Sequence, residues 1–185
     1  MARKTAAIGW LRIAMVVIAA MFLVKPSPGF ADTPAQALQR FGYIGTWSAD
    51  CAKDDVPRVT LSISTSGKPT WLLIQPHKLE ALWEIDTAEI VAEDKIKITR
   101  HLTSSIIKGQ ETKFANMEPI VVVTIKKEHK IRTMDEYRLS NHSWATAKEG
   151  FIYTPDQTQS HPFTDPTINT GKPTPFLEKC LNVGR

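Results

Sequence analysis

The ionisable side chains of this 185-residue chain are the first candidates for chemistry, and their spacing predicts no metal or catalytic site. No two of the five histidines stand in a His-x-His or His-Glu-x-x-His arrangement, the spacings that bring two imidazoles to one metal ion. We therefore expect no bound metal. The histidines are His77, His101, His129, His142 and His161.

Other catalytic motifs are incomplete. Ser66-Gly67-Lys68 resembles the end of a phosphate-binding loop, but Ser62 replaces the leading glycine and Pro69 follows the lysine. The Gly-x-Ser-x-Gly pattern of a nucleophile elbow is missing. Three carboxylates alternate along one stretch, which is typical of the solvated face of a strand. They are Glu80, Glu84 and Asp86. We expect no catalytic residue, no cofactor and no enzyme activity.

Aromatic residues are the most informative remaining set, because rings on strands can fill a core or line a binding cavity. The sequence leaves both possibilities open. We assign Trp47 a structural role in the core. The candidate ligand-binding residues are Trp71, Trp83, Tyr137 and Trp144.

Residues 1–31 have the pattern of a secretory signal peptide. Arg3 and Lys4 form a basic start, a largely apolar run follows, and Gly29-Phe30-Ala31 offers small residues for cleavage before Asp32. The alternative is an uncleaved membrane anchor, because the run is close to the ~20 residues that span a bilayer.

Cleavage would change the charge balance. Four of the 23 Lys and Arg residues lie in residues 1–31 and none of the 19 Asp and Glu residues does, so residues 32–185 carry 19 of each. A chain of nearly zero net charge has no electrostatic footprint for nucleic acid. We expect a periplasmic or secreted protein with no nucleic-acid partner and no stable membrane insertion after cleavage.

The two cysteines, Cys51 and Cys180, lie near opposite ends of residues 32–185. In an exported chain, two cysteines favour a structural disulfide over a metal or redox pair. On the chain-entropy model, closing so long a loop contributes on the order of 5 kcal/mol. Two free buried thiols are the alternative.

From Gly45 onward, apolar residues recur at every second position, with turn residues between the runs. A short helix precedes them, beginning at the capping box Thr33-Pro34-Ala35-Gln36. The sequence thus predicts one all-β domain over 32–185, an antiparallel up-and-down barrel of about eight strands. A two-sheet sandwich is the alternative.

Two segments are predicted without strands. Residues 103–117 have mixed polarity and are interpreted as a long loop. Residues 155–185 form a Pro-rich tail, which we expect to be extended coil pinned to the barrel by the disulfide. The pin itself, residues 176–181, is predicted as a short turn or helix.

A short helix leading into Gly45-Thr46-Trp47 at the start of the first strand resembles the lipocalin and avidin-like (calycin) barrels. Thr133-Met134-Asp135-Glu136-Tyr137 is similar to a Thr-Asp-x-x-Tyr element of some lipocalins, with one inserted residue. The resemblance implies a barrel in which Trp47 packs across the closed end. The chain departs from it after the last strand, where a Pro-rich tail replaces a long helix, and it lacks the avidin biotin-site residues.

Two functions follow from these patterns. The first is an exported, noncatalytic protein that binds a small apolar or amphipathic ligand inside a barrel. The alternative is a filled β domain that acts through surface contacts, as an envelope protein or a hydrolase inhibitor. In that case residues 103–117 and the tail are the contact surfaces.

Overall fold

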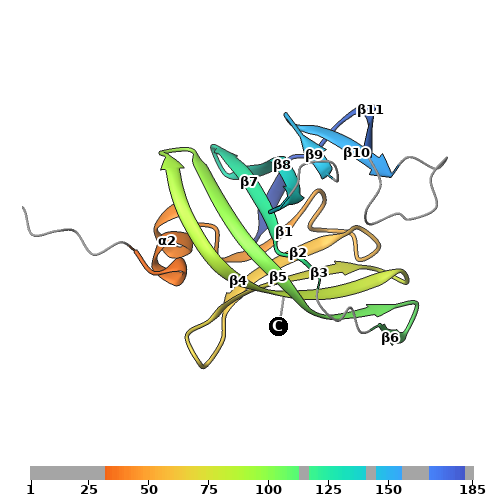
Figure 1. The fold of residues 1–185 in the computed structure, drawn as a ribbon, viewed down its shortest axis with the longest axis horizontal. Coiled ribbons are helices and arrows are strands. Elements are labelled where there is room, and N and C mark those ends of the chain that lie inside the picture. The colour runs from red at the N-terminus through yellow and green to blue at the C-terminus, as the bar shows by residue number, and fades with distance from the viewer. Residues whose placement is uncertain (1–31, 113–116, 141–144, 156–166, 182–185) are drawn as a thin grey trace, which may run out of the picture. The chain divides into compact units, whose positions relative to one another are not determined.

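The computed structural model describes residues 32–112, 117–140, 145–155 and 167–181. The predicted signal peptide and Trp144 lie outside these ranges. The described part of the chain forms one helix and twelve strands (Figure 1). Helix α2 spans Pro34–Phe41, and the strands are β1 (Gly45–Ser48), β2 (Arg58–Ile63), β3 (Pro69–Gln75), β4 (Leu79–Ala92), β5 (Lys95–Ile107), β6 (Gln110–Thr112), β7 (Ile120–Lys127), β8 (Lys130–Arg138), β9 (Ala145–Lys148), β10 (Phe151–Pro155), β11 (Thr167–Pro173) and β12 (Leu177–Cys180).

Helix α2 begins at the predicted capping box. The hydroxyl of Thr33 accepts a hydrogen bond from the backbone N–H of Gln36, and the Gln36 side chain accepts one from the backbone N–H of Thr33. The helix ends at Gly42, whose φ of 78° is the left-handed conformation that glycine adopts without strain. In the described ranges, no helix combines the length and apolarity that crossing a bilayer requires.

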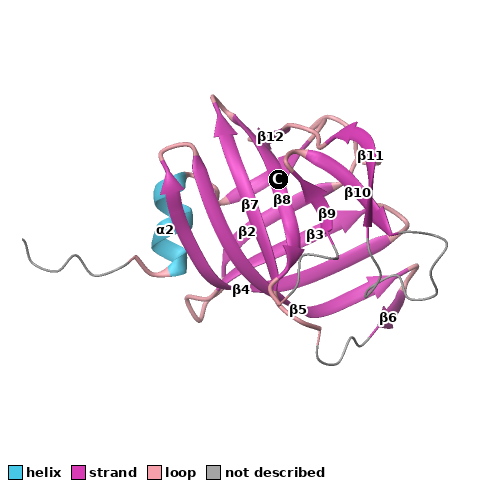
Figure 2. Ribbon diagram, turned by 45° about the horizontal axis from the view of Figure 1, so that its top comes forward, coloured by secondary structure: helices cyan, strands magenta, loops and turns pink. Residues whose placement is uncertain are grey.

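Eight strands close into an antiparallel barrel, as predicted (Figure 2). The ring runs β1–β2–β3–β4–β5–β7–β8–β12, and β12 pairs back with β1. Ring neighbours are consecutive strands from β1 to β5 and from β7 to β8, whereas β6 is skipped between β5 and β7, and β12 joins β8 to β1. The two-sheet sandwich is excluded by this closure.

The seam of the barrel is held by a disulfide. Cys51 lies just after β1 and Cys180 ends β12, and the two residues are bonded with their Cα atoms 5.4 Å apart. Across the same seam, Trp47 of β1 pairs with Lys179 of β12, and on the other side of β12 Leu177 pairs with Ile131 of β8. The predicted pairing is confirmed, and it ties the last strand to the first.

The segment predicted as a loop, residues 103–117, is partly strand. Strand β5 continues to Ile107, and β6 pairs back against it through a two-residue turn at Lys108 and Gly109. Both turn residues have positive φ, 49° and 80°, as a tight hairpin turn requires. The prediction failed because the alternation of β5 changes at Thr103, an extra residue that faces no partner in β4.

The C-terminal tail also differs from the prediction. Residues 167–173 form β11, which pairs with β10, and residues 177–180 form β12. The predicted turn or helix at residues 176–181 was wrong, because Leu177–Cys180 is extended between β1 and β8. This strand is mostly exposed and has no apolar alternation, so its pairing is determined by distant strands and not by local pattern.

The barrel is filled at the end next to helix α2. Leu38 and Phe41 of the helix pack with Tyr43, Ile96 and Ile98 in one buried cluster. Trp47 belongs to the same cluster and is 2% exposed. Tyr43 therefore marks the boundary between this filled half of the interior and the other half.

Candidate functional site

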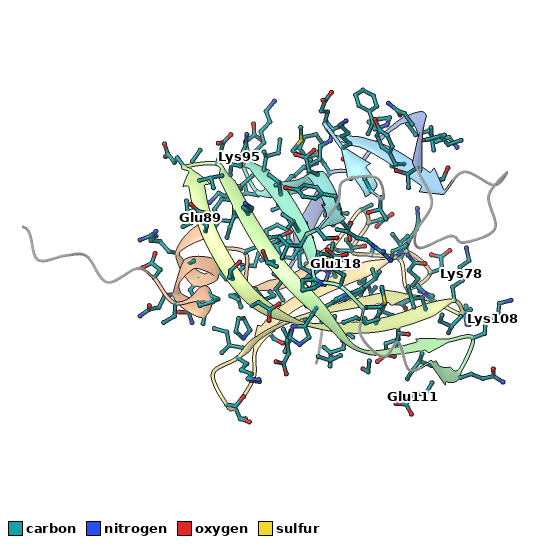
Figure 3. The ribbon with its side chains drawn as sticks, viewed as in Figure 1. Lys78, Glu89, Lys95, Lys108, Glu111 and Glu118 are labelled. Carbon is teal, nitrogen blue, oxygen red and sulfur yellow. A yellow bond between two sulfur atoms is a disulfide. The ribbon has the colours of Figure 1, made fainter. Side chains whose placement is uncertain are left out.

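The other half of the barrel interior contains a cavity of about 460 Å³. It extends from Tyr43 to Gln75 and Leu79, the residues that flank the β3–β4 turn. Figure 3 shows Lys78 of this turn beside Lys108, at the end of the strands away from helix α2. The cavity volume lies within the range of about 300–1,000 Å³ that small-molecule sites occupy.

Strand alternation and register build two of its walls. Each residue of β3 from Thr70 to Gln75 is paired with a residue of β4, the two side chains of a pair point to the same face of the sheet, and every second pair points inward. Three such pairs line the cavity. They are Trp71 with Trp83, Leu73 with Ala81, and Gln75 with Leu79.

Strand β5 forms a third wall only because of its bulge. Arg100 and Leu102 face the interior before Thr103, and Ser105 and Ile107 face it afterwards. Without the extra residue, the second pair would point outward. The Thr103 hydroxyl donates to the carbonyl oxygen of Leu82 at 2.8 Å, which holds the bulge against β4. The bulge therefore turns Ser105 and Ile107, and not Ser104 and Ile106, toward the cavity.

A largely buried ion pair between β5 and β8 lies in the cavity lining. The Nη2 of Arg100 donates to Oε1 of Glu136 at 2.6 Å, and the Arg100 side chain is only 4% exposed. The Cζ of Arg100 lies 4.1 Å from the ring centroid of Trp71 and 4.3 Å from that of Trp83. Cation–π contact with two rings and charge pairing together compensate the desolvation of the guanidinium.

The ion pair leaves hydrogen-bonding capacity unused. Among the described residues, six buried side-chain polar atoms have no hydrogen-bond partner, and five of them belong to residues that line the cavity. Buried polar atoms are nearly always paired in folded proteins, so such a concentration needs an explanation. The five atoms are Arg100 Nε and Nη1, Trp83 Nε1, Ser105 Oγ and Thr146 Oγ1.

The floor of the cavity is uncharged. The hydroxyl of Tyr43 lies 3.0 Å from that of Thr124, and burial raises the pKa of the phenol above its usual range. The Tyr43 ring also contacts Trp71 edge to face at 5.8 Å between centroids. Arg100 and Glu136 are therefore the charged groups that line the cavity.

The predicted ligand-binding residues separate into three groups. Trp71 and Trp83 meet in the cavity wall. Tyr137 lies on β8 opposite Val121 and does not line the cavity. Trp144 is outside the described residues. The sequence analysis missed Arg100 and Glu136.

A usable pattern did point to Arg100. The residue continues the inward series of Ile96 and Ile98, so a charge stands where an apolar side chain is expected. Glu136 lies within the element used for the lipocalin resemblance, but nothing in its neighbours marked it as inward-facing.

The alternating carboxylates singled out in the sequence lie away from this cavity. Glu84 pairs with Lys68 at 2.9 Å, and the lysine holds the pKa of Glu84 below its usual range. Asp86 lies 2.8 Å from Nδ1 of His101. No group of three or more His, Cys, Asp or Glu side chains in the described ranges is arranged to hold a metal ion.

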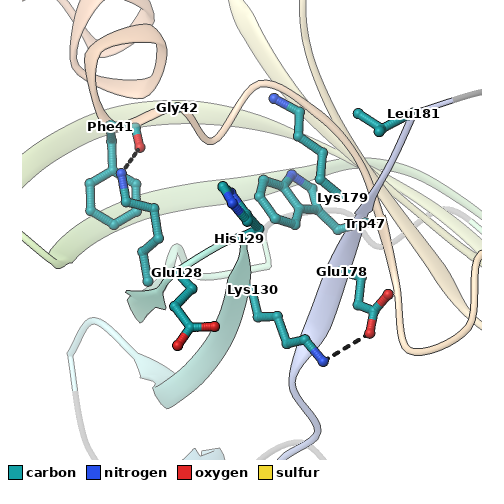
Figure 4. A pocket seen from close by; sticks show the side chains of 10 residues that line it. Phe41, Gly42, Trp47, Glu128, His129, Lys130, Glu178, Lys179 and Leu181 are labelled. Carbon is teal, nitrogen blue, oxygen red and sulfur yellow. Dashed lines mark hydrogen bonds and ion pairs between the residues drawn. The ribbon is translucent and has the colours of Figure 1, made fainter.

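A second pocket, of about 630 Å³, lies beside Trp47 at the helix end (Figure 4). Three of its charged side chains are paired: Lys126 donates to the carbonyl oxygen of Phe41 at 2.8 Å, and Lys130 pairs with Glu178 at 2.9 Å. None of the unpartnered buried polar atoms of the described residues belongs to its lining. The cavity inside the barrel is therefore the stronger candidate.

Comparison of the chain with protein-family models, with curated proteins and with solved structures finds no match. The closed eight-strand barrel is compatible with a calycin-like fold, and a relationship to lipocalins or avidins stays a prediction. The disulfide is consistent with an oxidising, exported environment. Indications of function must come from the cavity.

Proposed function

We propose that this is an exported, noncatalytic protein that binds a small apolar or amphipathic molecule inside the barrel. The observation that supports this most is the cavity of about 460 Å³, which has apolar walls and a small number of unpartnered polar atoms. Ligand sites typically combine an apolar surface with a few polar groups that orient the guest. The signal-peptide pattern of residues 1–31 and the Cys51–Cys180 bond support export.

Cavity filling tests the proposal. Ala81 is 3% exposed and lies in the cavity wall, so Ala81→Phe places a ring in the space that a ligand would occupy. The uncharged dye N-phenyl-1-naphthylamine should fluoresce with the wild-type protein, and Ala81→Phe should abolish most of that signal. Ala92→Phe, at the exposed end of the same strand, is the matched control and should bind the dye as the wild type does.

Thermal unfolding of both variants checks that they are folded, since overpacking can itself destabilise a core. A wild-type protein that binds no dye and carries no ligand in native mass spectrometry would contradict the proposal. Dye binding that survives Ala81→Phe in a folded protein would place the binding site elsewhere.

Surface contact, as an envelope protein or a hydrolase inhibitor, is the second candidate function. Strands β9, β10 and β11 lie outside the barrel ring, and Ile168 on the terminal strand β11 is 53% exposed. An exposed apolar side chain on an edge strand suits a protein contact. A partner captured by the wild type, lost with Ile168→Asp and kept with Ala81→Phe would favour this function.

A further inference from the structure

The polar groups of the cavity indicate which class of guest it takes, an inference that depends on the proposed ligand-binding function. Most of the unpartnered polar atoms of the cavity lining belong to Arg100 or to its neighbour Trp83. The guanidinium carbon of Arg100 lies 4.1 and 4.3 Å from the ring centroids of Trp71 and Trp83. A guest would hydrogen-bond to the guanidinium at its edge, where the N–H groups are, and neighbouring side chains must shift to admit it because Nε and Nη1 are buried.

Part of that edge is buried without a hydrogen-bond partner. Glu136 accepts from Nη2, and Nε and Nη1 have no partner. The indole N–H of Trp83 is also buried without a partner. These three nitrogen atoms can donate hydrogen bonds and cannot accept them, whereas the hydroxyls of Ser105 and Thr146 can do both. Donors therefore outnumber acceptors among the unpartnered atoms, and a guest that pairs the three N–H groups supplies acceptor oxygens.

The charge of the region is already balanced. Arg100 and Glu136 are the charged residues of the lining, and they form a pair. A carboxylate bound at the Arg100 edge would bring a second negative charge next to Glu136. Like charges repel strongly where water is excluded, and one of the two carboxylates would have to bind a proton. A neutral acceptor uses the same N–H groups without that repulsion.

We infer that the cavity selects an uncharged amphipathic molecule whose ester, amide or ketone oxygen accepts hydrogen bonds from Arg100 and whose hydrocarbon body lies along the apolar walls. Those walls extend from the tryptophans to Leu79 and Ile107, toward the open end of the barrel. Glu136 is then a specificity residue, because it neutralises Arg100 and discriminates against anionic guests.

Two probes with the same hydrocarbon chain test this selection. Dodecanamide and dodecanoate are compared as competitors of N-phenyl-1-naphthylamine on the wild-type protein at neutral pH. We expect the amide to bind about tenfold more tightly or better, the difference expected when one guest pairs the buried donors at no cost in charge. A carboxylate that binds as tightly as the amide, or more tightly, would overturn the inference.

A charge variant should change the preference. In Glu136→Gln the acceptor oxygen opposite Arg100 is kept and the competing charge is removed, so dodecanoate should gain about tenfold or more in affinity while dodecanamide changes little. Glu89→Gln removes the same charge from an exposed position of β4, labelled in Figure 3, and should change neither affinity. If both variants changed the affinity for dodecanoate equally, the effect would come from the net charge of the protein, which would contradict a specificity role for Glu136.

The double variant Arg100→Met, Glu136→Gln removes the donors without leaving a buried unpaired charge. Its affinity for dodecanamide should fall about tenfold if the amide oxygen is bound by Arg100. An unchanged affinity would mean that the Arg100 edge holds only water, which overturns the inference. Failure of every probe and of the dye on the wild-type protein is a separate result, because it removes the ligand-binding function itself.

Discussion

Arg100 and Glu136 are each tolerated inside the barrel only because the other is present. The Arg100 side chain is 4% exposed and that of Glu136 is 22% exposed, so the arginine depends more on its partner. Removing one member of a buried pair leaves an uncompensated charge, whereas replacing both members with apolar groups is often neutral or stabilising. Comparing the stability of single and double variants therefore distinguishes an ion pair that is retained for ligand binding from one that the fold requires.

A single and a double variant of this pair give a stability prediction. Glu136→Leu should lower the free energy of unfolding by about 3 kcal/mol, because Arg100 remains buried with no counter-charge. The double variant Arg100→Met, Glu136→Leu should recover most of that loss. Urea unfolding followed by tryptophan fluorescence measures both values. A double variant as unstable as the single one would indicate that the pair, and not the charge left behind, stabilises the barrel.

Trp47 is packed at the opposite end of the interior, in the buried cluster beside helix α2. Its Nε1 donates to the carbonyl oxygen of Tyr43 at 2.8 Å, and its ring contacts that of Tyr43 edge to face. Trp47→Ala should therefore lower the free energy of unfolding by roughly 3–5 kcal/mol, the usual cost of emptying a large aromatic site in a packed core. Chemical denaturation measures it. A loss below about 1 kcal/mol would mean that the ring is not packed as described.

The strands divide into those that local pattern could predict and those that it could not. Strand β2 alternates cleanly and β7 is rich in β-branched residues, so both were predicted from their own residues. The end of β5 was missed because the bulge at Thr103 reverses which residues face inward. Strand β12 was missed because its partners are far away in the sequence. The same limits explain why Trp71 and Trp83 were found and Glu136 was not.

Strand β12 is the element on which closure depends, and it is only four residues long. It matches β8 at only Leu177 and Glu178, so the disulfide at Cys180 supplies much of its attachment. Replacing both cysteines with alanine should lower the free energy of unfolding by roughly 2–5 kcal/mol, since the bond closes a very long loop. Denaturant unfolding of the oxidised wild type and the variant measures this.

Amide hydrogen exchange locates the effect of the disulfide. Loss of the bond should accelerate exchange most in β12 and in the facing residues of β1, because local opening begins where few contacts hold an element. The β7–β8 hairpin serves as the internal control and should be accelerated less. Uniform acceleration throughout the barrel would mean that the bond stabilises the whole fold and not the seam.

The barrel as a whole has two unlike ends. One half is packed with side chains of helix α2, Tyr43 and Trp47, and the other half contains the cavity. The filled end supplies stability, and the hollow end has fewer contacts, so its amides should exchange more readily. Ile106 and Ile107 are exposed at the hollow end, as is expected where a strand extends past the core. A guest in the cavity would replace the contacts that this end lacks.

Ligand binding should therefore reduce the difference in amide exchange rate between the filled end and the hollow end of the barrel. A ligand that binds only the folded state at a hundredfold excess over its Kd raises the free energy of unfolding by about 2.7 kcal/mol. With saturating dodecanamide, amide exchange should slow most near Gln75, Leu79 and Ser105, and least around Ile96 and Ile98, which are already fully buried. The Ala81→Phe variant should show neither the slower exchange nor the added stability. Protection centred on the helix end would assign the amide to the pocket beside Trp47.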